Sequence, residues 1–270
     1  MKLCNIYCEG KKGSHDFDIL EKTLGDLRPY IIIKPIGGKR GSRAIMNYVE
    51  TSGLSAEKAD DYLMFRDRDF DKPVPSQEQL IQDNHLFFSY RTTIENYLLD
   101  SQLIFDYDHK KGTNRFSSVD EVVNLLCEAA SCIKEYQAVR HALGVLHDGA
   151  SFGTRWTNSD GILPSQLGLD DCINAAYHNL IFNAKAKTDT WTLDNLKQEV
   201  NKFLDIFNEE FFCQQKYLVW FQGKDLAKSF CLKSNSFPME SYYKFAKSHF
   251  DFKKFADLIE LRRIVESKIQ

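Results

Sequence analysis

The sequence lacks the cysteine and histidine spacings that mark zinc sites. Its seven cysteines, an odd number, include no CxxC pair, and its seven histidines include no HExxH spacing. It also lacks an apolar run long enough to span a membrane, and Glu9 interrupts the N-terminal segment before a signal-length apolar run develops. These absences favour a cytoplasmic protein with reduced thiols over a disulfide-bonded or membrane-inserted one.

The chain has little excess charge of either sign. Its formal net charge is −3, so no overall basic field attracts nucleic acid, and any such contact must be local. A hydrophobic content of 43% and a charged content of 27% are ordinary for a globular protein. The 270 residues suit one large domain or two smaller ones, and no internal repeat or low-complexity linker is visible.

The first hundred residues alternate apolar, strand-like runs with helical patterns. Strands interleaved with short helices imply an α/β fold with a parallel sheet and right-handed crossovers. Ser14 and Ser42 are suitable helix caps, and Gly53 follows the end of the second helical pattern. We predict strands over residues 3–8, 31–38, 62–71 and 85–90, with helices after Ser14 and over 42–53.

From about residue 101 the pattern is mostly helical. We therefore predict a sheet domain over residues 1–100 and a mostly helical domain over 101–270, which supplies dimerisation, partner or substrate contacts. The aromatic-rich part of this region, near Trp220 and Phe230, either stacks on bases or forms core. We predict helical stretches over 118–147, opened by a capping box, 192–212 and 252–269, and a loop-rich part over 148–168.

The stretch 62-YLMFRDRDFD-71 places aspartates at 67, 69 and 71, which share one face if the strand continues that far. Parallel sheets bind ligands at the carboxyl ends of their strands, where Glu9 and the Asp67/Asp69 pair fall. Like charges this close repel unless a cation or solvation offsets the cost. We predict that Asp67 and Asp69 hold Mg²⁺, and that Glu9 holds a second ion or acts as general base. The alternative is a solvated acidic turn, which is our interpretation of Asp71.

A Walker-type nucleotide site is the obvious rival for an aspartate after an apolar strand. It requires GxxxxGK[ST], which neither 8-CEGKKGSHDF-17 nor 36-IGGKRGS-42 supplies. The glycines and cations of these loops instead suggest a phosphate-contacting surface, since glycine lets backbone approach a phosphate closely. A solvated charge run is the alternative. The candidate phosphate-binding residues are Gly10, Gly38, Lys39, Arg40 and Arg43.

The order of these features resembles the TOPRIM domain. That domain is the metal-binding module of topoisomerases, primases and overcoming-lysogenisation-defect (OLD) nucleases. The resemblance covers residues 1 to about 100. It consists of strands that end in Glu9-Gly10, in Gly37-Gly38 and in an Asp67-x-Asp69 motif, with a helix after each of the first two.

The segment 91-RTTIENYLLD-100 is similar to one in a group of OLD-like TOPRIM nucleases often encoded beside ABC-type ATPases in bacterial defence loci. The group includes the nuclease subunit of the PARIS anti-phage system. The resemblance implies that Glu95 is a further metal ligand and that Gly223-Lys224 matches a C-terminal Gly-Lys element, with Lys224 catalytic beside Glu9, Asp67 and Asp69. The alternatives are that Glu95 is a glutamate on a helix surface and that Lys224 is an exposed lysine.

The resemblance implies a Mg²⁺-dependent endonuclease, with Mn²⁺ as a second usable ion. It further implies a toxic effector of anti-phage defence that cleaves host RNA such as transfer RNA. A partner ATPase would control it, and the chain would form a homodimer away from membranes. The alternative is a non-catalytic subunit that binds nucleic acid or the ATPase. A topoisomerase or primase is disfavoured, because zinc-ribbon cysteines and room for strand-passage domains are lacking.

Overall fold

The computed structural model describes residues 2–38, 41, 62–70, 81–82, 85–146, 168–183 and 192–270. The chain forms two compact units. The predicted helix over 42–53 and, apart from Gly168, the predicted loop-rich part over 148–168 lie outside the described residues. Unit 1 comprises Met1–Arg68, Pro75–Ile94 and Lys244–Gln270, and unit 2 comprises Asp69–Val74 and Glu95–Tyr243.

Unit 1 is built on a five-stranded sheet of order β2-β1-β3-β5-β4. The first four strands in this order pair in parallel, and β4 pairs antiparallel with β5. The predicted α/β class with a parallel sheet is confirmed, whereas the two-residue edge strand β4 was not predicted. The strands are β1 (Cys4–Cys8), β2 (Ile31–Pro35), β3 (Tyr62–Arg66), β4 (Ile81–Gln82) and β5 (Leu86–Phe88).

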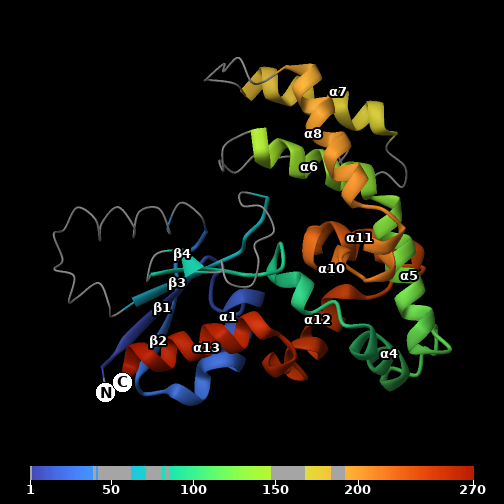
Figure 1. Ribbon diagram of the computed structural model, residues 1–270. Helices are drawn as coiled ribbons and strands as arrows, with labels where there is room; N and C mark the ends of the chain where they lie inside the picture. Colours follow the sequence, from blue (N-terminus) through green and yellow to red (C-terminus); the bar gives the residue numbers. More distant parts are fainter. Residues whose placement is uncertain are drawn as a thin grey trace. The chain divides into compact units, whose positions relative to one another are not determined.

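Helices α1 (His15–Leu24) and α13 (Ala256–Ile269) pack on each other and against the sheet (Figure 1). Three consecutive residues of β3, Leu63 to Phe65, are buried, as expected for a parallel strand covered on both faces. Short 3₁₀ helices η1 (Gly25–Leu27) and η4 (Phe252–Lys254) precede β2 and α13. The core of unit 1 therefore combines both ends of the chain.

The compact units divide the chain differently from the predicted boundary at residue 100. Residues 244–270 belong to the unit that contains the sheet, because α13 contacts β1 and buries Leu258, Leu261 and Val265. The Lys2 N–H also donates a hydrogen bond to the Ile269 carbonyl at 3.0 Å. The sequence pattern placed this amphipathic helix in the helical region, because an apolar stripe shows that a helix packs against something but does not show which element it packs against.

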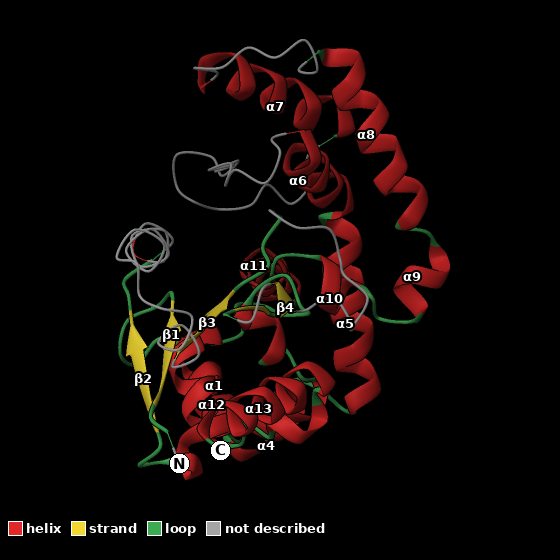
Figure 2. Ribbon diagram, turned by 60° about the vertical axis from the view of Figure 1, so that its left-hand side comes forward, coloured by secondary structure: helices red, strands yellow, loops and turns green. Residues whose placement is uncertain are grey.

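Unit 2 is helical, which confirms the predicted helical C-terminal region. Helices α4, α5 and α11 pack together, as do α6, α7 and α8 (Figure 2). The predicted stretch over 118–147 is two helices that break at Ile133. The elements are η3 (Ile94–Tyr97), α4 (Ser101–Lys110), α5 (Val119–Cys132), α6 (Lys134–Leu146), α7 (Leu169–Asn183), α8 (Leu193–Ile206), α9 (Glu209–Cys213), α10 (Tyr217–Trp220), α11 (Gly223–Lys233) and α12 (Met239–Ser248), of which η3 begins and α12 ends in unit 1.

Local signals fix several boundaries in unit 2. Half of the predicted capping box is present, since Ser118 Oγ accepts the Glu121 N–H at 3.2 Å. The Glu121 carboxylate accepts the N–H of Ser117, one residue before the cap, at 2.7 Å. Much of the aromatic-rich region is core: Tyr217, Phe221, Phe230, Phe237 and Tyr242 are all buried. These five rings stabilise the helical unit and are not available to stack on bases.

Candidate active site

Three strand ends meet at one edge of the unit 1 sheet. Cys8 is in register with Pro35 of β2 and with Phe65 of β3, so Glu9 and Asp67 leave neighbouring parallel strands at the same edge. The loop after β2 joins them, because the Gly37 N–H donates to the Gly10 carbonyl at 3.3 Å. The predicted convergence of Glu9, Gly37-Gly38 and Asp67 at one sheet edge is therefore found within unit 1.

Neither aspartate lies on the extended strand: Asp67 directly follows β3, and Asp69 lies in a turn. Strand β3 ends at Arg66, and Asp69 has a φ of 49°, in the left-handed region that aspartate and asparagine tolerate better than most residues. The condition for a shared strand face is thus not met, and Asp71 lies outside the described residues. Asp67 ends the unit 1 segment with Arg68, while Asp69 begins unit 2.

Glu9 is held by Arg66, which is not among the predicted site residues. Arg66 Nε donates to Glu9 Oε1 at 2.6 Å, and both side chains are less than one-fifth exposed. The contact follows from register: one step beyond the Cys8–Phe65 pair, Glu9 lies beside Arg66. The signal in the sequence is the Arg66 that precedes Asp67, but only the register shows its partner.

Arg68, between Asp67 and Asp69, is fully buried. Its Nε donates to the Tyr90 carbonyl at 3.3 Å and its guanidinium to Thr92 Oγ1 at 2.9 Å. The Tyr90 N–H in turn donates to the Asp257 carboxylate of α13 at 3.1 Å. Arg68 therefore ties the end of β3 to the loop that follows β5.

Gly10 is predicted to contact phosphate, and in the structure it also has a packing role. Its N–H donates to Asp16 Oδ2 at 2.5 Å, and a Cβ at this position would overlap Asp16 and Ser14. The N–H is thus occupied by the first turn of α1. Gly38 has a φ of 114°, which a non-glycine residue rarely adopts. Lys39, Arg40 and Arg43 lie outside the described residues, so their phosphate-binding role stays a prediction.

In unit 2, the structure brings Glu95 and Lys224 together. Lys224 Nζ lies 3.5 Å from Glu95 Oε1; the lysine side chain is 66% exposed and that of the glutamate only 7%. Glu95 is therefore not a helix-surface residue. Its Oε2 atom is buried and accepts no hydrogen bond from the described residues. A buried carboxylate oxygen without a donor is costly, and a cation would relieve that cost.

Gly223 explains why α11 begins beside Glu95. A Cβ on Gly223 would lie 2.7 Å from the Asn96 nitrogen and 2.9 Å from Glu95 Cβ. The Asn96 side-chain amide also donates to the Phe221 carbonyl at 2.9 Å. Only glycine lets the helix start approach η3 this closely, and the next residue, Lys224, then faces the carboxylate.

Tyr243 adds a neutral group to this carboxylate. Burial raises the pKa of the Tyr243 phenol, and the negative charge of Glu95 raises it further. The hydroxyl therefore stays protonated at neutral pH. Glu95 thus lies beside the Lys224 cation and within electrostatic range of an un-ionised phenol.

The predicted ligand set is chemically suited to Mg²⁺, which prefers carboxylate oxygens and keeps several waters. Of these predicted ligands, Glu9 and Asp67 belong to unit 1, and Asp69 and Glu95 belong to unit 2. Among the described residues, no three His, Cys, Asp or Glu side chains form a group that would hold a metal ion. Glu95 offers a buried carboxylate oxygen, Oε2, that accepts no hydrogen bond from these residues, and Asp67 offers a second such buried oxygen, Oδ1.

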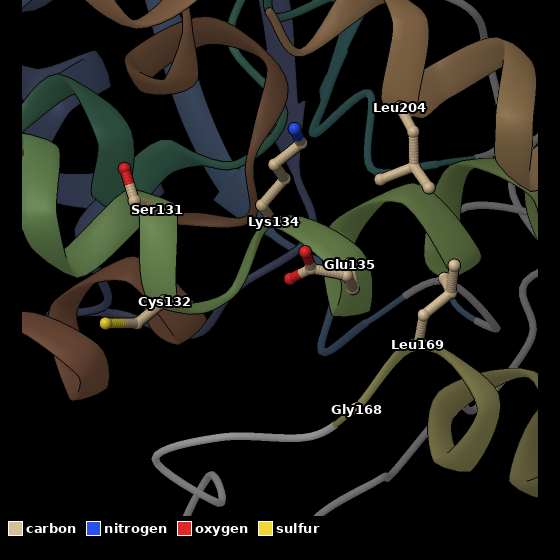
Figure 3. Close-up of a pocket in the computed structure, with 7 residues that line it drawn as sticks. All are labelled: Ser131, Cys132, Lys134, Glu135, Gly168, Leu169 and Leu204. Carbon is tan, nitrogen blue, oxygen red and sulfur yellow. The ribbon is translucent and has the colours of Figure 1, made fainter.

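Two hollows in the described residues lie apart from these carboxylates. One in unit 2, of about 670 Å³, contains none of the predicted site residues (Figure 3); its lining is Ser131, Cys132, Lys134, Glu135, Gly168, Leu169 and Leu204. The other, in unit 1, has a volume of about 530 Å³ and is lined by three lysines, two acids and a serine: Lys22, Lys244, Lys247, Asp18, Glu21 and Ser248. Only this second hollow gathers cations.

The fold and the candidate site define an α/β protein whose parallel sheet carries acidic residues at the carboxyl ends of its strands, joined to a helical unit. No protein-family model matches the chain, and no curated protein matches it either. Within the residues that the structure describes, no helix has the length and apolar character required to cross a membrane.

Proposed function

We propose that this chain is a Mg²⁺-dependent endonuclease that hydrolyses phosphodiester bonds of nucleic acid. The observation that carries the proposal is the parallel register of β1 and β3, which brings Glu9 and Asp67 to the same sheet edge. Two acidic residues on neighbouring strand ends supply the ligand chemistry that phosphoryl-transfer enzymes use with Mg²⁺.

In the proposed reaction, Glu9 accepts a proton from the attacking water or ligates a metal ion, while the Arg66 guanidinium keeps its carboxylate in place. Asp67 and Asp69 would hold Mg²⁺, and Glu95 would be an outer ligand or ligate a second ion. The ion, when bound, activates water and neutralises charge on the phosphate. The positive charge of Lys224 would stabilise the negative charge that develops on the phosphate oxygens.

The biological role in this proposal rests on the resemblance of residues 91–100 to the defence-associated nucleases. We propose a toxic effector of an anti-phage system that cleaves host RNA such as transfer RNA and is controlled by an ABC-type ATPase. In this proposal the chain acts in the cytoplasm as a homodimer, and Mn²⁺ replaces Mg²⁺ in vitro.

The test is a cleavage assay with labelled transfer RNA and DNA, in Mg²⁺ or Mn²⁺, with and without candidate ATPase partners. Glu9→Gln should lower the rate by about 10²–10⁴-fold if the residue is the general base. The matched control is Asp106→Asn, a charge-removing change at an exposed position of α4. No metal-dependent cleavage by the wild type under any condition, or equal rates in Glu9→Gln and the wild type, would overturn the proposal.

A non-catalytic binding subunit is the second candidate, and the Arg66–Glu9 ion pair favours it, since that pair gives Glu9 a structural partner. This candidate predicts nucleic-acid or ATPase binding that needs no divalent ion. It also predicts that binding survives Glu9→Gln. Cleavage that depends on Glu9 excludes it.

A further inference from the structure

One side of α6 is polar although it is buried. Gln137, Arg140, His141 and Gly144 recur at three- and four-residue spacing and therefore share that side of the helix. The first three are 0%, 9% and 4% exposed. Buried polar side chains require hydrogen-bond partners. Two chain segments of unit 2, each adjacent to a predicted site residue, contact this side of α6. One supplies hydrogen-bond partners for Gln137 and Arg140, and the other supplies a ring contact; the His141 ring also hydrogen-bonds to the Trp220 carbonyl at 2.9 Å.

The first segment is the start of α11, which carries Lys224. The Arg140 guanidinium donates to the buried Asp225 carboxylate and, at 2.6 Å, to Gln222 Oε1. Gln137 binds the same two residues: its amide donates to Asp225 at 2.9 Å and accepts the Gln222 N–H at 3.0 Å. Residues 222 and 225, which flank Gly223-Lys224, are thus fixed to α6.

The second segment is the turn that carries Asp69. The Arg140 Cζ atom lies 4.4 Å from the centre of the Phe70 ring, and the His141 ring meets the same ring edge-on at 4.8 Å. A Cβ on Gly144 would overlap the Phe70 carbonyl oxygen, so glycine lets the turn lie directly against the helix. Phe70 immediately follows Asp69 and anchors it to α6.

The geometry points to Arg140 as a positioning residue that sets Asp69 and Lys224 relative to each other. Its planar guanidinium stacks on Phe70 with one face while its edge binds Asp225 and Gln222, a combination that lysine does not reproduce. The inference rests on the proposed function, because it assumes that Asp69 and Lys224 act in the reaction. Arg140 itself touches no reacting group.

The test compares Arg140→Lys with Arg115→Lys. Arg115 is a matched control: its Cζ lies 5.9 Å from the centre of the Phe237 ring and its Nε 4.0 Å from Asp108, yet neither contact involves α11 or Phe70. Misplacement by about 1 Å costs up to about 10²-fold in rate, so Arg140→Lys should lower kcat by about 10–100-fold. The KM for nucleic acid should stay within about twofold, and Arg115→Lys should match the wild type. Equal kcat values for Arg140→Lys and the wild type, or equal losses in both variants, would overturn the inference.

Amide hydrogen exchange separates this inference from the nuclease proposal, because it needs no activity. In Arg140→Lys, residues 223–226 and the amides of Asp69 and Phe70 should exchange faster together, while α4 keeps its wild-type rate. Unchanged exchange at either segment would overturn the positioning role, whatever the cleavage assay shows. Coupled exchange in a chain that never cleaves nucleic acid would support the coupling by Arg140 and reject the nuclease.

Discussion

The two units hold their charged site residues by different means. In unit 1, Glu9 and Asp67 are placed by the hydrogen-bond ladder of β1 and β3, so their positions follow from backbone pairing. In unit 2, Lys224 and Glu95 meet because Gly223 permits a close contact and Arg140 binds Asp225. Side-chain substitutions should therefore leave Glu9 and Asp67 in place, because backbone pairing positions them. Comparable substitutions in unit 2 should displace Lys224 and Glu95, because only a few buried contacts position them.

After Glu9→Gln, the largest loss of rate is expected from substitutions of the two aspartates, which test their role as metal ligands. Asp67→Asn and Asp69→Asn keep side-chain shape, and asparagine also tolerates the left-handed backbone of residue 69. Loss of a metal ligand removes several kcal/mol of charge stabilisation, which corresponds to a rate loss on the order of 10²–10³-fold. Cleavage rates over a Mg²⁺ titration measure it. Wild-type rates in both variants, with intact folds by circular dichroism, would remove the aspartates from the mechanism.

A smaller effect is expected from Lys224→Met. The lysine side chain is 66% exposed, so its removal should leave the fold stable while kcat falls by about 10–10²-fold through the lost positive charge. Lys233→Met, an exposed lysine at the end of the same helix, is the matched control. Equal kcat for the two variants would assign Lys224 to the surface and leave Glu95 without a catalytic partner.

Gly223→Ala tests whether unit 2 depends on close contacts. The added Cβ would lie within 3 Å of the Asn96 N and Oδ1 atoms and of Glu95 Cβ. We therefore expect the free energy of unfolding to fall by about 1–3 kcal/mol. Gly25→Ala in unit 1 is the control: its φ is −61° and the nearest heavy atom to a new Cβ is Glu21 Oε2 at 3.6 Å. Urea unfolding of both variants measures the difference. Equal stability would mean that η3 and α11 shift at little cost.

Much of unit 1 was predictable from the sequence, because periodicity identifies strands and parallel pairing brings their carboxyl ends to one edge. That reasoning placed Glu9, Gly38 and Asp67 together. It overestimated the length of β3, which ends at Arg66, since the alternating charges imitate an alternating strand. Local pattern does not show where pairing stops.

The roles of three arginines were not predictable in this way. Arg66, Arg68 and Arg140 each depend on a partner that is distant in the chain or set by register, and the partner decides whether an arginine is buried or solvated. The Gly223-Lys224 element was noticed only through a family resemblance. Its physical reason, the contact of Gly223 with Glu95 and Asn96, requires coordinates.

The smallest expected effect concerns the lysine-lined hollow of unit 1. Lys22 and Lys244 form no ion pair within the described part of the chain, whereas Lys247 pairs with Asp18 at 2.6 Å. If the two contact a nucleic-acid backbone, Lys22→Gln with Lys244→Gln should weaken binding a few-fold. The slope of log K against log salt should fall by less than about 2, since each phosphate contact contributes about 0.7–0.9.

Binding is measured in an Asp67→Asn background to prevent cleavage, with Lys216→Gln plus Lys233→Gln in unit 2 as a charge-matched control. Because the phosphate term is independent of sequence, the loss should be the same for every nucleic acid tested. If both double variants lower the salt-dependence slope equally, the weaker binding results from the change in net charge. The hollow then has no part in binding, and the phosphate contacts of unit 1 must come from elsewhere in the unit.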